Sequence, residues 1–333
     1  MDQSKKCTFS VVVPVYNSER SLEELYQRLS ATFEKMGASF EVIFVNDKSS
    51  DTSYAVLRKI HKRYPENTTI IDLLKNYGQH NAIMCGFNYS RGAYVITIDD
   101  DLQNPPEEIP ALFKKLEEGY DVVFGIPEEK NHKAYKNLGS LMIRKLNRKI
   151  FHLKDKMSFS SYRIIRREVV DEAKSIKTPF PYISGMLLTI TTSVTNHKVE
   201  HLARKYGRSN YNLAKLIHLS FNLLINYSSI PLRIVAVFGF TISIISLIIG
   251  LGYIFKQLFI GKAPEGWTTL IVFISFYNAL FLVFFSILGE YISRLLKESS
   301  KISQFVVRTV HYRKGSSDPR QEVASSQINV IDE

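Results

Sequence analysis

The first part of the chain alternates between short apolar runs and longer segments that mix polar and apolar residues. Segments of helix length, such as 22–36 and 51–64, separate runs that are rich in β-branched and aromatic residues. Apolar strands that alternate with helices are typical of a parallel sheet covered on both faces. We therefore predict an α/β domain with a mostly parallel sheet over residues 1–210. Its predicted strands are 9–15 (FSVVVPV), 40–45 (FEVIFV), 69–74 (TIIDLL), 94–99 (YVITID) and 120–126 (YDVVFGI).

Two long uncharged stretches follow this domain. Residues 234–255 and 266–289 contain no charged side chain, and each is roughly 33 Å long as a helix, which matches the apolar core of a bilayer. We predict transmembrane helices over 231–256 and 267–296. Two core helices of a soluble protein are the alternative, but buried helices are rarely this long and this apolar. Basic residues flank the outer ends of the stretches, so the positive-inside rule places the catalytic domain and both termini on the cytoplasmic side of the inner membrane.

The segments beside these stretches are more polar. Residues 211–229 place their apolar side chains on one helical face, which predicts a juxtamembrane amphipathic helix over 211–230. This helix lies either in the membrane interface or against the soluble domain. Residues 297–333 are expected to form a cytoplasmic tail that is partly disordered, because small and polar residues cluster in it. The chain begins with MDQSKKCTFS, which lacks the apolar core of a signal peptide.

Composition narrows the function classes only slightly. The 333 residues carry a formal net charge of +11, which suits a nucleic acid, an anionic membrane or an anionic small substrate. No nucleic-acid recognition motif is present, so we expect no nucleic-acid partner. Cys7 and Cys85 lack metal-ligand spacing and are expected to be reduced, as in a cytosolic domain.

Polar residues follow each of the first four predicted strands. In chain order they read PVYNSE, VNDKSSD, KNYGQH and DDDLQ. Ligands of parallel α/β sheets bind beyond the carboxyl ends of the strands, so these segments form the candidate site. Neither GxGxxG nor GxxxxGK occurs, so a dinucleotide-binding or P-loop site lacks its phosphate cradle.

Three consecutive carboxylates, Asp99, Asp100 and Asp101, end the fourth strand run. If strand alternation continues to this point, Asp99 and Asp101 share one face and Asp100 points away. Two carboxylates at a strand end suit Mg²⁺ or Mn²⁺, with substrate phosphates completing the coordination. The alternative is an acidic turn that caps the helix after the double proline at 105–106. That turn accounts for the two glutamates that follow but not for the three aspartates.

These motifs, in this order and spacing, resemble the family 2 glycosyltransferases of GT-A fold, a Rossmann-like α/β fold. The resemblance rests on VVVPVYNSE, FVNDKSSD, LLKNYGQHNAIMCGF, IDDDLQNPPEEIP and GYDVVFG. It continues through RKYGRSNY, YSSIPLR and LGEYISR, which are similar to the polyprenyl-phosphate branch of the family. Within that branch the likeness is to undecaprenyl-phosphate formamido-arabinose transferases and bactoprenol glucosyltransferases, and more distantly to dolichyl-phosphate mannose synthase.

The resemblance implies an enzyme that transfers a sugar, with inversion, from a nucleotide-sugar to a polyprenyl phosphate for cell-envelope glycan modification. The similar enzymes imply a UDP-linked donor. Asp101 is then the expected ligand for Mn²⁺ or Mg²⁺, with Asp99 beside it and nearer the ribose or sugar. The expected catalytic residues are Asp99, Asp101 and Arg163. Contacts to the nucleotide-sugar are expected from Pro14, Tyr16, Glu19, Asp47, Asn76, Gly78, Asp99 and Gln103. His80 lies in the same region and is given no catalytic role.

The chain departs from these relatives at residues 157–165, MSFSSYRII, where they carry an aspartate. Serines occupy this stretch, while Arg163 is retained. A lipid phosphate monoester has a second pKa of about 6 by analogy with phosphorylated side chains, so the acceptor is largely ionised near neutral pH and needs no general base. We therefore expect substitution of Ser161 to change activity little and substitution of Arg163 to change it more.

Basic side chains are needed to hold the acceptor, because guanidinium groups suit phosphate and the two substrates are both anions. The candidates for lipid phosphate binding are Arg163, Arg204, Arg208, Ser209, Tyr211 and Lys215. For each basic one, a solvated surface charge is the alternative. Membrane lipids and further copies of the chain, as a homo-oligomer, complete the expected partners.

Two other functions compete with this assignment. A processive membrane polysaccharide synthase would share the nucleotide-binding half, but it needs more spans and an acceptor motif such as QxxRW, neither of which is visible. A non-enzymatic membrane scaffold would keep the apolar stretches without needing carboxylates at the strand ends.

Overall fold

The computed structural model describes residues 8–128, 157–178, 181–202, 205, 266–299 and 303–315, with scattered positions between 232 and 259. The chain divides into two compact units. The first comprises Met1–Asn210 and Ser303–Glu333, and the second is Tyr211–Ile302. The first unit contains the polar strand ends, so it holds the candidate site.

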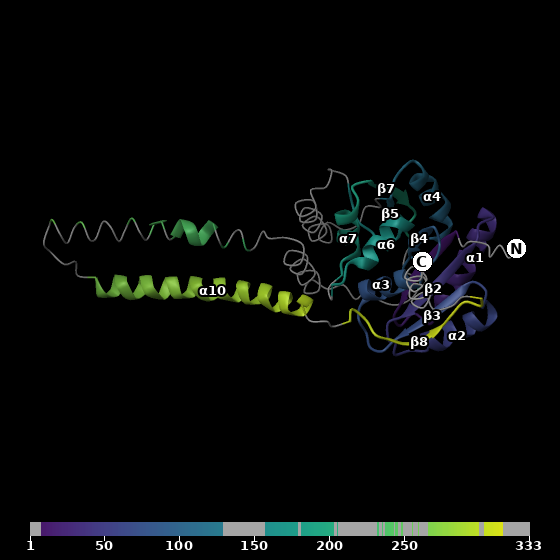
Figure 1. The fold of residues 1–333 in the computed structure, drawn as a ribbon, viewed down its shortest axis with the longest axis horizontal. Coiled ribbons are helices and arrows are strands. Elements are labelled where there is room, and N and C mark those ends of the chain that lie inside the picture. Colours follow the sequence, from purple (N-terminus) through teal and green to yellow (C-terminus); the bar gives the residue numbers. More distant parts are fainter. Residues whose placement is uncertain are drawn as a thin grey trace, which may run out of the picture. The chain divides into compact units, whose positions relative to one another are not determined.

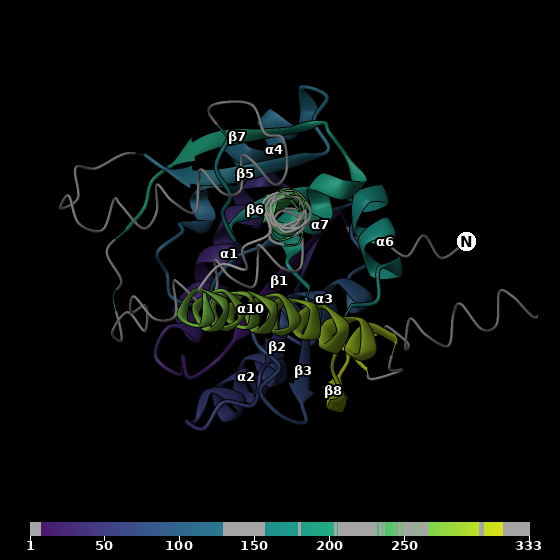
Figure 2. The ribbon, with the colours of Figure 1, turned by 90° about the vertical axis from the view of Figure 1, so that its left-hand side faces the viewer.

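An eight-stranded sheet forms the centre of the first unit (Figure 1). Its strands follow the order β7-β5-β6-β4-β1-β2-β3-β8, and in Figure 2 the labelled strands run in this order from β7 at the top to β8 at the bottom. Four of the seven strand pairings are parallel and three are antiparallel, so the sheet is mixed but mostly parallel, as predicted. The strands are β1 Phe9–Val15, β2 Phe40–Asn46, β3 Thr68–Leu73, β4 Tyr94–Thr97, β5 Val122–Pro127, β6 Arg163–Arg166, β7 Val194–Val199 and β8 Val307–His311.

All five strands predicted from the apolar runs are present as β1 to β5, with ends that differ by no more than two residues. The strands β6 and β7 were not predicted, because RIIR is short and charged and VTNHKV is polar. The described helices are α1 Leu22–Met36, α2 Ser53–Arg63, α3 Gln79–Tyr89, the 3₁₀ turn η1 Pro106–Glu108, α4 Ile109–Glu117, α6 Arg167–Ser175, α7 Ile183–Ile190 and α10 Trp267–Ser299.

Apolar layers cover both faces of the sheet. Alternation along β1 sends Val11 and Val13 to one face, where α1, α2 and α4 cover them. Val12 faces the other side, which α3, α6 and α7 cover. The helix α3 packs so closely that a Cβ atom at Gly86 would lie 2.3 Å from Cγ1 of Val12. The loops at the carboxyl edge of the sheet therefore rest on a rigid base.

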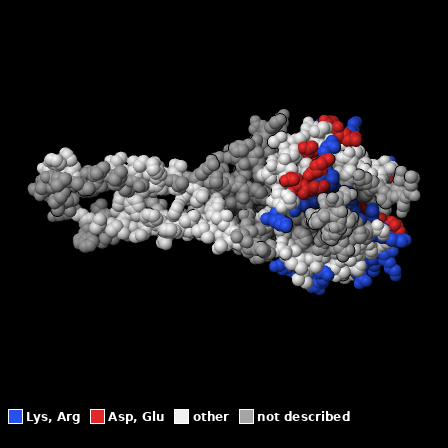
Figure 3. Space-filling model, in the orientation of Figure 1, with Lys and Arg blue, Asp and Glu red and all other residues white. Residues whose placement is uncertain are grey.

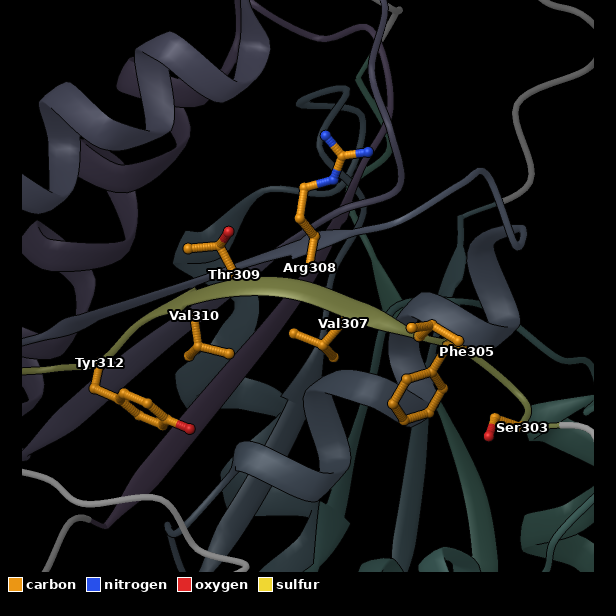
Figure 4. Close-up of a pocket in the computed structure, with 8 residues that line it drawn as sticks. Ser303, Phe305, Val307, Arg308, Thr309, Val310 and Tyr312 are labelled. Carbon is orange, nitrogen blue, oxygen red and sulfur yellow. The ribbon is translucent and has the colours of Figure 1, made fainter.

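The segment after the second apolar stretch returns to the sheet. Residues 307–311 form β8, an edge strand antiparallel to β3, whereas the sequence analysis assigned 297–333 to a separate, partly disordered tail. A register shift opposite Asp72 and Leu73 lets Arg308 and Thr309 point to one side while Val307 and Val310 point to the other (Figure 4). The two valines pack against the core on the α3 side of the sheet, which is why this short segment docks there. Residues 316–333 lie outside the described part of the chain.

The second unit contains α10. Within it, the 18 residues Phe276–Ser293 have a mean hydropathy of 1.4, so among the described residues this is one helix long and apolar enough to cross a membrane. Its large apolar side chains, including Phe276, Phe281 and Leu282, are exposed. The first predicted span, 231–256, is described only at scattered helical positions, and the predicted amphipathic helix over 211–230 lies outside the described residues. The second predicted span, 267–296, falls within α10.

Candidate active site

The loops that follow β1, β2, β3 and β4 meet at the carboxyl edge of the sheet, as the parallel pairing requires. Among the residues that the structure describes, three non-glycine residues have positive φ, and each lies in one of these loops: Asn17 (φ 56°), Lys48 (φ 59°) and Leu102 (φ 61°). Left-handed backbone at non-glycine residues is strained and tends to cluster at functional sites. For Asn17 the strain is small, because asparagine tolerates this region, but for Leu102 it is not. The edge is therefore shaped by backbone that packing must hold in place.

The loop after β4 does not continue the strand alternation. The strand ends at Thr97, and residues 98–101 form a loop. The prediction that strand alternation places Asp99 and Asp101 on one face was therefore wrong in its premise. The three carboxylates nevertheless face different donors. Asp99 accepts hydrogen bonds from Gln79 Nε2 at 2.6 Å and from Ser161 Oγ at 2.5 Å. Asp101 accepts from the backbone N–H of Gln103 at 3.1 Å.

Asp100 ties the loop after β4 to the loop after β1. Its Oδ2 accepts a hydrogen bond from the backbone N–H of Tyr16 at 3.1 Å, and its carbonyl accepts one from Ser21 Oγ at 2.5 Å. Burial raises the pKa of Asp100 to about 7, and the charges of Asp99 and Asp101 add to this effect, although hydrogen bonds from Ser18 and Tyr16 oppose it. Asp100 thus has a structural contact of its own and does not share the environment of its two neighbours.

The other predicted nucleotide residues hold the neighbouring loops together. Asp47 is 3% exposed, and its two oxygens accept hydrogen bonds from the backbone N–H groups of Tyr77 (2.7 Å) and Gly78 (2.8 Å). Burial raises the pKa of Asp47, and these hydrogen bonds oppose the rise. Glu19 accepts from Thr52 through both the backbone N–H (3.0 Å) and Oγ1 (2.5 Å), and these contacts lower the pKa of Glu19. Both carboxylates therefore fix loops, and their contacts to a nucleotide stay predictions.

Of the remaining residues predicted to contact the nucleotide, some have exposed side chains and others have structural contacts within the fold. The ring-bearing side chain of Tyr16 is 50% exposed, and Asn76 is exposed too, so both are accessible to a ligand. Pro14 is buried within β1 and shapes the strand end instead. Gly78 has a φ of +87°, which only glycine adopts readily, and it begins α3. Gln103 joins the site to the segment after β7, because its carbonyl accepts from the backbone N–H of Leu202 at 2.9 Å.

Arg163 lies below the site and not on its surface. It is 1% exposed, in β6, and its Nε donates to Thr97 Oγ1 at 2.9 Å while Nη1 donates to Ser184 Oγ at 3.0 Å. Burial lowers the pKa of Arg163 to about 10, and the charge of Asp99 opposes this. The predicted role of Arg163 in lipid phosphate binding therefore stays a prediction, and in the structure its guanidinium is engaged by Thr97 and Ser184. The other five residues predicted to bind that phosphate, Arg204, Arg208, Ser209, Tyr211 and Lys215, lie outside the described residues.

His80 lies in the first turn of α3, beside Arg163. Burial lowers the pKa of His80 to about 4, and the charge of Arg163 adds to the effect, so the imidazole is neutral at physiological pH. Its ring packs edge-to-face on Tyr182 with the centroids 5.5 Å apart. Among the described residues its Nδ1 finds no hydrogen-bond partner. These contacts make His80 part of the packing between α3 and its neighbours.

The described residues contain no group of three or more His, Cys, Asp or Glu side chains that could hold a metal ion by themselves. The donor set present nevertheless fits a hard divalent cation bound together with a substrate. Mg²⁺ in particular is held by one or two carboxylates plus substrate phosphates in many nucleotide enzymes. Asp101 and Asp99 are the two carboxylates that the loop after β4 offers.

Charge is distributed unevenly over the first unit. Lys and Arg side chains gather over α2 and β8 (Figure 3). Arg58, Lys59 and Lys62 line a hollow there of about 500 Å³, together with His61 and His311. Because His311 pairs with Ile70, near the amino end of β3, this basic surface is separate from the carboxyl edge that holds the aspartates. A second hollow, of about 450 Å³, follows β8 itself (Figure 4).

Three residues of the site were missed or misread from the sequence. Gln79 and Thr97 carry no motif that marks them, and only the meeting of α3, β4 and β6 shows that they belong to the network around Asp99. Ser161 was noticed only as a departure from relatives, because its contact with Asp99 spans 62 positions of sequence. A long-range hydrogen bond of this kind leaves no signal in residue type or spacing.

Comparisons with known proteins agree with this geometry. The model of the family described as glycosyl transferase family 2 matches residues 10–173. The chain is 33% identical over 319 residues to the undecaprenyl-phosphate 4-deoxy-4-formamido-L-arabinose transferase of Edwardsiella ictaluri, covering 94% of this chain and 97% of that protein. It is 30% identical over 306 residues to the uncharacterized glycosyltransferase YkcC of Bacillus subtilis, covering 92% of this chain and 94% of that protein.

Among solved structures, the glucosyl-3-phosphoglycerate synthase of Mycobacterium tuberculosis, solved with Mn²⁺, UDP and glucosyl-3-phosphoglycerate, is similar with a TM-score of 0.50. The match covers 66% of this chain and 78% of that one at 18% identity, so it shows the fold alone. Together with the α/β sheet, it confirms a GT-A-like arrangement of the first unit. The chain belongs to glycosyl transferase family 2. It is a glycosyltransferase, homologous over nearly its whole length to undecaprenyl-phosphate sugar transferases.

Proposed function

We propose that this enzyme transfers a sugar from a UDP-sugar to a polyprenyl phosphate of the undecaprenyl or dolichyl type, with inversion, to give a polyprenyl-monophosphate sugar. The observation that carries the proposal is the extent of the homology. It runs through the apolar segments of the second unit as well as the GT-A-like unit, covering 94% of this chain and 97% of a named undecaprenyl-phosphate transferase. A soluble glycosyltransferase would match over the first unit alone.

The donor nucleotide binds across the loops after β1, β2 and β3 in this proposal. Tyr16, with half of its surface exposed, offers an aromatic face for the base, and Asp47 holds the neighbouring loop at Tyr77 and Gly78. Asp101, with Asp99 beside it, holds Mn²⁺ or Mg²⁺ when the donor is bound. The cation supplies charge neutralisation for the departing diphosphate. The Mn²⁺ and UDP in the glucosyl-3-phosphoglycerate synthase support this choice by analogy of fold.

The reaction needs no proton transfer from the protein. An oxygen of the ionised lipid phosphate attacks the anomeric carbon, its new bond forms as the bond to the UDP oxygen breaks, and the electron pair leaves with UDP. The stretch 157–161 offers hydroxyl groups and no carboxylate, and Ser161 already donates its hydrogen bond to Asp99. A single displacement of this kind inverts the anomeric configuration.

In this proposal the second unit anchors the enzyme in the inner membrane, and the first unit lies on the cytoplasmic side. One described helix, α10, has the length and composition of a span, and the sequence supplies a second uncharged stretch at 234–255. A polyprenyl phosphate keeps its chain in the bilayer, so a transferase anchored beside the headgroups meets its acceptor there. The multi-pass topology and a homo-oligomer remain parts of this proposal.

The test is transfer by full-length protein in lipid nanodiscs that contain undecaprenyl phosphate. Labelled UDP-sugars are supplied one at a time with Mn²⁺, and the label is followed into the lipid fraction. We expect one UDP-sugar to label the lipid, and mild acid to release the labelled sugar from the product, because the anomeric bond of a glycosyl phosphate is acid-labile. Label that enters a polymer instead of the lipid monophosphate, or no lipid label with any donor, contradicts the proposal.

A further inference from the structure

We propose that a buried chain of hydrogen bonds from Ser184 to Ser161 positions the Asp99 carboxylate, and that Ser161, Gln79 and Thr97 are positioning residues for the transfer. The inference rests on the proposed function, because it takes Asp99 to contact the donor. It also revises the expectation drawn from the sequence, that Ser161 could be replaced at little loss and that Arg163 binds the lipid phosphate directly.

The carboxylate of Asp99 is held from both sides. Gln79, from the first turn of α3, donates to Oδ1 at 2.6 Å, and Ser161, from the loop before β6, donates to Oδ2 at 2.5 Å. The two donors come from different elements and reach different oxygens, so together they fix both the position and the rotation of the carboxylate plane.

Ser161 is itself held in place by a hydrogen bond to its backbone carbonyl. Thr97, the last residue of β4, donates its hydroxyl proton to the carbonyl of Ser161. A hydroxyl that donates one hydrogen bond can still accept, and Thr97 Oγ1 accepts from Arg163 Nε at 2.9 Å. Arg163 is held in turn by Ser184, which accepts from Nη1 at 3.0 Å. This series of hydrogen bonds therefore connects α7, β6 and β4 to the carboxylate of Asp99.

The residues at the centre of this series of hydrogen bonds are buried, which distinguishes it from polar contacts at the surface. Thr97 is 0% exposed and Arg163 is 1% exposed. A buried guanidinium is tolerated only when its donors are satisfied, so Arg163 is fixed by its partners and in turn fixes the rotamer of Thr97. The ring of Phe124, 5.9 Å from Arg163 Cζ, covers its remaining face. Rigid support of this kind is what holds a reacting group in productive geometry.

The test compares matched substitutions in full-length protein in nanodiscs. Ser161→Ala and Thr97→Val remove a hydroxyl, whereas Ser161→Thr and Thr97→Ser keep one at the same position. Ser175→Ala, at an exposed helix end away from the site, is the control for substitution itself. The measurements are kcat and KM for lipid labelling, the affinity for UDP with Mn²⁺ by titration calorimetry, and the melting temperature.

We expect Ser161→Ala and Thr97→Val to lower kcat/KM at least about 10-fold, the effect of one hydrogen bond to a charged group. The hydroxyl-bearing replacements are expected to recover most of that loss. The decisive measurement is made in an Asp99→Ala background, where Ser161→Ala should have no further effect on UDP affinity or residual transfer, because residues that act through one group are not additive.

Each other result counts against the proposal in a distinct way. Ser161→Ala and Thr97→Val with kcat/KM within twofold of the wild-type value would show that Asp99 needs no such support. An undiminished effect of Ser161→Ala in the Asp99→Ala background would assign Ser161 a role that does not pass through Asp99. If the wild-type protein neither binds UDP with Mn²⁺ nor labels the lipid, the donor assignment itself fails and this inference falls with it.

Discussion

At the scale of single residues, buried or partly buried carboxylates connect the loops of the candidate site through hydrogen bonds. Asp47, Asp99 and Asp100 each accept a hydrogen bond from a loop other than their own. Like charges placed side by side repel, and the neighbours Asp99 and Asp101 help to raise the pKa of Asp100. A proton on Asp100, or one that Asp100 shares with a neighbouring carboxylate, relieves part of this repulsion. A bound cation relieves the rest. Of the three consecutive aspartates, Asp100 thus has a structural role, whereas Asp99 and Asp101 are the proposed ligand-binding residues.

The first prediction follows from this division. Asp101→Asn keeps the shape of the side chain and the contact to the backbone of Gln103 but removes the charge that a cation needs. We expect the variant to fold normally and to lose metal-activated transfer by at least about 100-fold, in line with the loss of an electrostatic contact made in the transition state. Lipid labelling at increasing Mn²⁺, with circular dichroism as the folding control, measures this. Full turnover of the wild-type enzyme in excess chelator would refute the metal assignment.

The second prediction concerns His80 and pH. Its pKa is lowered from 6.5 to about 4 by burial, so below about pH 6.5 the unfolded chain takes up a proton that the folded chain does not. His80 therefore removes stability as pH falls from about 6.5 to 4, with a slope of up to about 1.4 kcal/mol per pH unit. Asp100, whose pKa is raised to about 7, acts in the opposite sense over the same range.

The difference between variant and wild type separates the two effects. His80→Gln should flatten the fall in stability between pH 6.5 and 4, measured as urea midpoints at several pH values. A His80→Gln curve parallel to that of the wild-type protein would mean that His80 is not buried as a neutral ring. Because the comparison is between slopes, it does not depend on the absolute stability of either protein.

At the scale of elements, the packing of α3 on the sheet sets the position of Gln79 and of the loop before it. Gly86 lies over Val12, and a Cβ atom there would be 2.3 Å from Cγ1. We expect Gly86→Ala to destabilise the first unit by about 1 to 3 kcal/mol, because overpacking outweighs the helix propensity gained. Urea denaturation measures this change.

The control for that prediction makes room for the new methyl group. In the double variant Val12→Ala with Gly86→Ala, the destabilisation should be smaller than the sum of the two single effects, since the clash is removed. A sum that is additive within about 0.5 kcal/mol would show that α3 adjusts without strain. Stabilisation by Gly86→Ala alone would mean that the helix lies farther from β1 than the structure places it.

The sequence was sufficient for the elements that repeat a pattern and insufficient for those that do not. The strands β1 to β5 are apolar runs between helices, so alternation located them, and α1 was predicted with its observed bounds. The strands β6, β7 and β8 are short or polar and join the sheet by antiparallel or distant pairing, which no local pattern marks. The candidate site followed the same rule. Strand-end motifs nominated Asp47, Asp99 and Asp101 as candidates, whereas the supports from Gln79 and Thr97 depend on tertiary contacts.

At the scale of the whole molecule, the chain leaves the first unit near residue 210 and returns to it at Ser303. The departing side is held to the site, because Leu202 donates its backbone N–H to the carbonyl of Gln103. The returning side is held by β8 on the edge of β3 and by Gln304, whose Nε2 donates to the carbonyl of Thr178 at 2.6 Å. In the sequence, the second unit is thus an insertion between two segments that the first unit holds by hydrogen bonds.

The last prediction tests the direction of that insertion in the membrane. Basic residues flank the outer ends of the two uncharged stretches, while the loop 256–265 between them carries two lysines and one glutamate, so the loop should face the outside. In a Cys7→Ser background, where the remaining Cys85 is buried, single cysteines are introduced as Gly261→Cys and Ser325→Cys. A membrane-impermeant maleimide applied to intact cells should label Gly261→Cys, and it should label Ser325→Cys only after the membrane is permeabilised. Labelling of Ser325→Cys from outside would place the tail, and with it β8 and the catalytic unit, on the far side of the membrane from the cytoplasmic nucleotide-sugar pool. Labelling of neither residue before permeabilisation would show that the two stretches do not cross the bilayer as a pair. Because β8 belongs to the same sheet as the aspartates, the side that holds residue 325 is also the side on which the proposed transfer takes place.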